Sequence, residues 1–115
     1  MIARCFYCPG GAEERMHIRD VHVEYMIAHR GLVSTGGALM SEDGASVIGM
    51  LVLLECETLT EAEAFLADEP YSRAGLFASR TIDRLARFIP HQDPHLLERL
   101  LASSRQWIKD QRSSA

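Results

Sequence analysis

The sequence predicts an α+β domain in which short strands alternate with helices, followed by a C-terminal helix. The 115-residue chain is long enough for one domain, and 47% of its residues are apolar, as in ordinary globular proteins. Runs with strand periodicity alternate with runs of helical periodicity. One run, residues 45–56, is apolar on both strand faces, which indicates a central strand covered on both sides.

The first half of the chain places two strands and a helix around that central run. Residues 2–7 form the first predicted strand, which ends at a Pro-Gly-Gly loop. Residues 12–30 form the first predicted helix, because an apolar stripe recurs at helical spacing: Ile18, Val21, Tyr25 and Ala28. Gly31 occupies the position of a left-handed C-cap. Residues 32–39 favour a second strand, and a Ser-Glu-Asp-Gly turn at 41–44 leads into the central strand.

Helix signals dominate the second half of the chain. Residues 60–63, Thr-Glu-Ala-Glu, match a capping box and predict a short helix that ends before Pro70. Residues 77–89 are ambiguous, because their apolar spacing favours a helix whereas their threonine, isoleucine and phenylalanine content favours a strand. Asp93 and the proline after it predict the start of a helix over residues 94–111.

The ambiguous segment decides the topology. If residues 77–89 form a strand, the order is βαββαβ plus a tail helix, the ferredoxin-like arrangement with an antiparallel sheet. The two helices of that arrangement cover only one face of the sheet. The apolar second face of residues 45–56 must then be buried by the tail helix or by a second chain. We favour face-to-face pairing of two sheets in a homodimer.

Composition and charge exclude several functions. The net charge of −4 argues against nucleic acid as the main partner. The longest apolar run, residues 47–54, is too short to span a membrane, and no signal peptide is recognisable. Three cysteines argue against a disulfide scaffold and favour a reducing, cytoplasmic setting. The single lysine, Lys109, argues against Schiff-base chemistry, and no nucleotide-binding motif is found, so no cofactor is expected.

Four short motifs follow one another in a characteristic order. They are Arg19-x-x-His22, Leu-Val-Ser-Thr-Gly-Gly at 32–37, Asp-Glu-Pro-Tyr at 68–71 and Ala-Gly-Leu at 74–76. Together they resemble the YCII family (YciI-like proteins), a branch of the dimeric α/β-barrel proteins. The resemblance covers residues 1–89 as one domain; it implies a homodimer and makes residues 77–89 a strand. Residues 90–115 are then a C-terminal helical extension that the resemblance does not explain.

The resemblance also implies a site that pairs His22 with the acidic residue before the proline-aromatic pair, here Glu69. The family usually has Asp at this position, and the adjacent Asp68 could substitute. Helical spacing predicts that the histidine lies where the helix meets the sheet, because it falls in the series Ile18, His22, Tyr25 and His29 beside the apolar stripe. A carboxylate on one ring nitrogen would fix the tautomer of an imidazole that titrates near neutral pH. The alternatives are a structural histidine and a solvated glutamate.

The candidates for substrate binding are Arg19, Tyr71 and Asp68, the last as the neighbour of Glu69. Arg19 lies one helical turn before the histidine and could hold a substrate carboxylate, with a surface ion pair as the alternative. Tyr71 could line a pocket for a small ring, with core packing as the alternative. No metal site is expected, because Cys5 and Cys8 point to opposite faces of a strand and no second pair completes a ligand set.

The sequence thus predicts a small homodimeric enzyme that acts on a small organic acid by proton transfer, in a hydrolysis, elimination or isomerisation. In this hypothesis His22 is the general acid/base, Glu69 orients it, and Arg19 clamps the anion. The alternative is a non-catalytic module that binds a small ligand in the same cleft, or one that serves only for dimerisation.

Overall fold

The computed structural model describes residues 1–114. These residues divide into two compact units, and the boundary in the sequence falls between Leu85 and Ala86. The elements are, in chain order, β1 (Ile2–Tyr7), α1 (Gly11–Glu14), the 3-10 helix η1 (Arg15–Ile18), α2 (Arg19–Ala28), β2 (Val33–Met40), β3 (Val47–Leu54), α3 (Leu59–Asp68), α4 (Pro70–Arg73), β4 (Phe77–Asp83) and α5 (Leu96–Ser114). The first unit holds every element up to β4, and the second holds α5.

The four strands form one antiparallel sheet in the order β2-β3-β1-β4. With helices after β1 and after β3, this order is the ferredoxin-like βαββαβ arrangement, so the predicted fold class is confirmed. The ambiguous segment is a strand over Phe77–Asp83, in register with β1. Pairing with β1 outweighs the local helical spacing, and most residues with that spacing, 85–89, lie beyond the strand.

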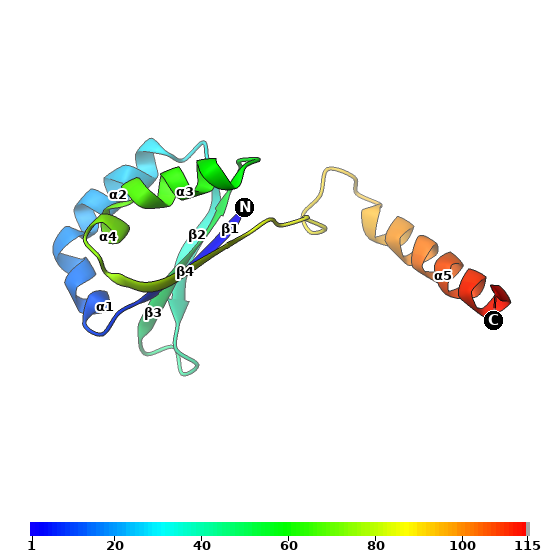
Figure 1. Ribbon diagram of the computed structural model, residues 1–115, viewed down its shortest axis with the longest axis horizontal. Helices are drawn as coiled ribbons and strands as arrows, with labels where there is room; N and C mark the ends of the chain where they lie inside the picture. The colour runs from blue at the N-terminus through cyan, green and yellow to red at the C-terminus, as the bar shows by residue number, and fades with distance from the viewer. Residues whose placement is uncertain (115) are drawn as a thin grey trace. The chain divides into compact units, whose positions relative to one another are not determined.

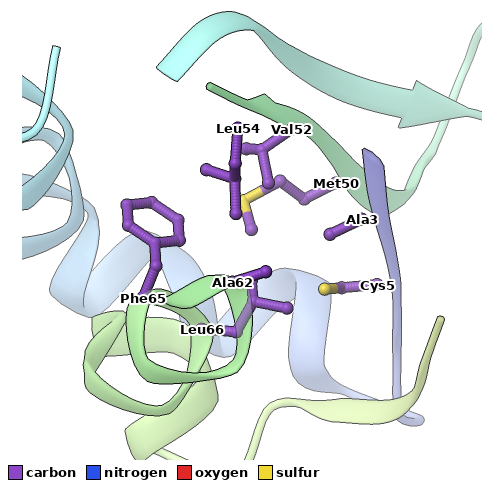
Figure 2. Close-up of a cluster of buried hydrophobic side chains, with 8 residues drawn as sticks. All are labelled: Ala3, Cys5, Met50, Val52, Leu54, Ala62, Phe65 and Leu66. Carbon is purple, nitrogen blue, oxygen red and sulfur yellow. The ribbon is translucent and has the colours of Figure 1, made fainter. Parts of the chain in front are cut away.

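The core lies between the sheet and one layer of helices. In Figure 1, α2, α3 and α4 lie on the same face of the sheet. The side chains drawn in Figure 2 come from β1, β3 and α3 and form the buried cluster: Ala3, Cys5, Met50, Val52, Leu54, Ala62, Phe65 and Leu66. Alternate residues of β3 therefore face the helices. The intervening residues, Leu51 and Leu53, lie on the opposite face. Leu51 is half-buried there and Leu53 is buried.

The first helix differs from the prediction. It is divided into α1, η1 and α2, and Ile18 leaves the helical region at φ −126° before α2 begins. Two residues of the predicted stripe, Val21 and Ala28, are exposed. Gly31 is not a left-handed cap, because its φ is not positive; the helix ends instead at His29, whose N–H donates to Tyr25 and Met26 carbonyls.

Helix ends elsewhere follow local signals more closely. Thr58 caps α3, where its Oγ1 accepts a hydrogen bond from the Glu61 N–H at 3.2 Å, so the capping box lies two residues before the predicted one. Both segments match the same pattern, and the sequence alone does not choose between them. Asp93 Oδ1 accepts from the His95 N–H at 2.9 Å just before α5. No helix within residues 1–114 is long and apolar enough to cross a membrane.

Candidate active site

The structure brings His22 and Glu69 together. His22 Nδ1 and Glu69 Oε1 are 2.5 Å apart, across 47 residues of sequence. The Glu69 side chain is fully buried, whereas the His22 side chain is 15% exposed. The pair therefore has a buried carboxylate on one side and an imidazole that still reaches solvent on the other.

Local sequence explains how Glu69 reaches that position. The residue before a proline avoids the helical region, and Glu69 is extended (φ −64°, ψ 129°) between α3 and α4. Its Oε2 accepts a hydrogen bond from the Ser72 N–H at 3.1 Å and so caps α4. Its other oxygen is left for His22. One carboxylate thus joins α4 to α2.

Aromatic side chains fix the plane of the imidazole. The rings of His22 and Tyr71 are stacked, with centroids 4.0 Å apart and planes 9° apart. Tyr7 packs edge-on against Tyr71 with a centroid distance of 6.2 Å. Farther along α2, the Tyr25 hydroxyl donates to the Phe65 carbonyl at 2.7 Å and holds α2 against α3. With both its edge and its face in contact, the imidazole has little freedom to rotate.

A cleft of about 420 Å³ opens beside this pair, within the size range of small-molecule sites. Side chains of η1, of α2 and of the turn after α2 contribute to its lining at sequence spacings of four, three, four and four: Arg15, Arg19, His22, Met26 and Arg30. The opposite wall is backbone and small or apolar side chains of β2 and β3, including Gly36 and Gly37. The cleft is therefore cationic on its helix side and apolar on its sheet side.

Arg15 is the most enclosed cation of the cleft. Its Nε is buried and has no hydrogen-bond partner among the described residues. Burial raises the pKa of the Tyr71 hydroxyl, and the nearby positive charge of the Arg15 guanidinium opposes the rise. Burial, with Tyr71 nearby, also raises the pKa of Tyr7 to about 12. Both tyrosines therefore carry neutral hydroxyls near neutral pH.

The other predicted site residues separate into two groups. Arg19 and Tyr71 line the cleft, Tyr71 as a buried side chain and Arg19 as an exposed one. Asp68 is exposed and is not part of the lining, so Glu69 is the carboxylate that contacts the histidine. The roles assigned to these residues stay predictions.

Sequence reasoning missed three lining residues with polar side chains: Tyr7, Arg15 and Arg30. The two arginines had a detectable signal, because they share the helical spacing of Arg19 and His22. Tyr7 had none, since it is the last residue of a strand and approaches the site only through the sheet.

Neither Cys5 nor Cys8 lines the cleft. Cys5 is buried in the core, and its burial raises the pKa of its thiol to about 11. The Cys8 Sγ lies 3.8 Å from the Gly75 carbonyl oxygen. Within residues 1–114, no three His, Cys, Asp or Glu side chains form a group that could hold a metal ion.

Comparison with known proteins gives the family. The model of the YCII-related domain matches residues 2–86. A similar solved structure is 5-chloro-2-hydroxyhydroquinone dehydrochlorinase from Burkholderia phenoliruptrix in complex with 2,5-dihydroxybenzoquinone. It has 22% sequence identity and a TM-score of 0.67, over 75% of this chain and 92% of that chain, and this likeness shows a shared fold. No curated protein matches the sequence. The chain belongs to the family of proteins built on the YCII-related domain, as its motifs predicted.

Proposed function

We propose that the protein is an enzyme that moves a proton on a small organic acid bound in the cleft. The observation that carries the proposal is the 2.5 Å contact between His22 Nδ1 and the buried Glu69 carboxylate, at the wall of a cationic cleft. An ionised carboxylate only accepts hydrogen bonds, so it favours a proton on Nδ1 and leaves the lone pair of Nε2 for the ligand.

The proposed step starts at a C–H bond next to an acidic or carbonyl group. His22 Nε2 takes the proton, and the electron pair left on the carbon either moves to the carbonyl oxygen or expels a leaving group. Glu69 stabilises the imidazolium that forms, and Arg15 and Arg19 hold the anionic ligand. Isomerisation and elimination both fit this scheme, and the similar dehydrochlorinase is named for an elimination.

A proton-transfer enzyme can be tested before its substrate is known. Small carboxylates and 2,5-dihydroxybenzoquinone would be incubated with the protein in D₂O, and proton NMR would follow the exchange of their C–H protons. We expect the wild type to catalyse exchange in at least one compound, and His22→Gln to lower that rate by about 10²- to 10⁴-fold. An equal rate in His22→Gln would refute the proposal. Ligands that stabilise the protein in a thermal-shift assay without exchange, in both forms, would favour the non-catalytic binding module.

We also propose that two copies pair through the sheet face that the helices leave uncovered. That face carries apolar side chains of two central strands, among them Phe6 (36% exposed) and Leu51. A second copy would bury them in the way expected for a dimeric barrel. Light scattering should give the mass of a dimer, and Leu51→Asp should give a folded monomer. A monomeric wild type would contradict the pairing.

A further inference from the structure

We propose that the ligand of the cleft is an elongated organic dianion, with one acidic group at Arg15 and Arg19 and the other at Arg30. This inference rests on the proposed function, because it names the ligand class of the same cleft. Its support comes from the distribution of charge, the missing partners of these arginines and the spacing between them.

The charge of the cleft is opposite to that of the unit that contains it. Residues 1–85 contain 13 acidic and seven basic side chains, and three of the seven basic ones line this cleft. Among the described residues of the lining, none is acidic. Such a concentration of cations in an acidic domain favours an anionic ligand over a neutral or cationic one.

No carboxylate partner neutralises the three arginines within residues 1–114, since none of Arg15, Arg19 and Arg30 forms an ion pair there. The buried, unpartnered Nε of Arg15 is a costly feature unless a ligand oxygen accepts from that side chain. Arg30 uses its Nε on the Ile27 carbonyl at 3.3 Å, which leaves its two terminal amino groups for a ligand.

Spacing separates the cations into two ends. Arg15 and Arg19 are four residues apart, whereas α2 extends from Arg19 to Ala28, a rise of about 14 Å at 1.5 Å per residue, and Arg30 lies two residues beyond its end. Between them α2 lines the cleft with His22 and with the apolar side chains of Val23 and Met26. One small carboxylate cannot reach both ends. A ligand with two acidic groups joined by an apolar segment can, with the arginine side chains closing part of the gap.

The experiment compares diacids with monoacids of equal length by titration calorimetry at constant ionic strength. The pairs are succinate with butyrate, adipate with hexanoate, and suberate with octanoate. We expect adipate or suberate to bind about two- to fivefold more tightly than its monoacid, the gain typical of one exposed charge pair. Succinate, which is too short to span the cleft, should show no such gain.

Single substitutions test which arginine binds the acidic group at each end of the cleft. Arg30→Gln should reduce the long diacids to the affinity of their monoacids. Arg15→Gln should weaken every acid about tenfold, because it removes an enclosed charge-assisted contact. Arg19→Gln, at an exposed position, tests the same end if Arg15→Gln does not fold. Arg73→Gln is the matched control, since Arg73 is exposed and outside the lining.

Two results would overturn the inference. Long diacids that bind no more tightly than monoacids would show that the cleft has one anionic subsite. If Arg73→Gln weakened the binding of the long diacids as much as Arg30→Gln, Arg30 would act only through the net charge of the protein and not as a contact at one end of the cleft. Because these titrations measure binding alone, loss of proton exchange in His22→Gln remains a separate test of the proposed function.

Discussion

Replacing Glu69 by glutamine isolates the role of its carboxylate. The two oxygens of Glu69 both accept hydrogen bonds, Oε1 beside His22 Nδ1 and Oε2 from the Ser72 N–H. A glutamine side chain has one oxygen and one NH₂ group in their places. If the oxygen faces Ser72, the NH₂ group faces Nδ1 and favours a proton on Nε2 instead. If the oxygen faces His22, the NH₂ group opposes the Ser72 N–H and the cap is lost.

The geometry sets the size of the effect. Loss of the helix cap costs about 1 kcal/mol, and loss of a hydrogen bond to a charged group costs about 1.5–3 kcal/mol. Glu69→Gln can keep one of the two bonds, so we expect the free energy of unfolding to fall by about 1–3 kcal/mol. The side chain is fully buried, and water therefore cannot replace the lost partner.

Two assays separate structure from chemistry. Urea denaturation measures the free energy of unfolding, with Glu63→Gln on the exposed side of α3 as the matched control. Nitrogen-15 NMR of the imidazole, assigned by comparison with His22→Gln, identifies the protonated ring nitrogen. We expect a proton on Nδ1 in the wild type and a shift toward Nε2 in Glu69→Gln wherever the α4 cap is kept. A wild-type ring protonated on Nε2 alone would refute the proposed orientation, whatever the stability change.

Three further predictions concern the fold. Thr58→Ala should lower the free energy of unfolding by about 1 kcal/mol and Thr60→Ala by much less, because only Thr58 caps α3; equal effects in urea denaturation would contradict this. Gly49→Ala should lower the free energy of unfolding by about 1–3 kcal/mol, since its new methyl group would collide with the Cys5 carbonyl oxygen. The methyl group of Gly37→Ala meets no atom within 4 Å, so this variant should be as stable as the wild type or slightly more stable, and thermal melting distinguishes the two variants. The raised pKa of Cys5, about 11 against 9.0, means that the unfolded chain loses the thiol proton first. Stability from this group should be complete below pH 9 and decline toward pH 11, and Cys5→Ala should remove that part of the pH dependence.

Local signals in the sequence predicted the structure correctly where a short segment satisfies its own hydrogen bonds or presents one apolar face. The proline after Glu69 ends α3, and the turn before β3 has Gly44 at positive φ. The same reasoning failed at Gly31, because a glycine after a helix is permitted but not required to take the left-handed conformation.

The sequence by itself determined the α+β class, the central position of the 45–56 run and the helix face that carries His22. Those features follow from periodicity and from residues close together in the chain. Only the tertiary structure decided that residues 77–83 pair as a strand with β1, and that Glu69 rather than Asp68 meets His22. Both outcomes depend on contacts between segments far apart in sequence. Local propensity carries no information about which distant partner satisfies a backbone edge or a buried carboxylate.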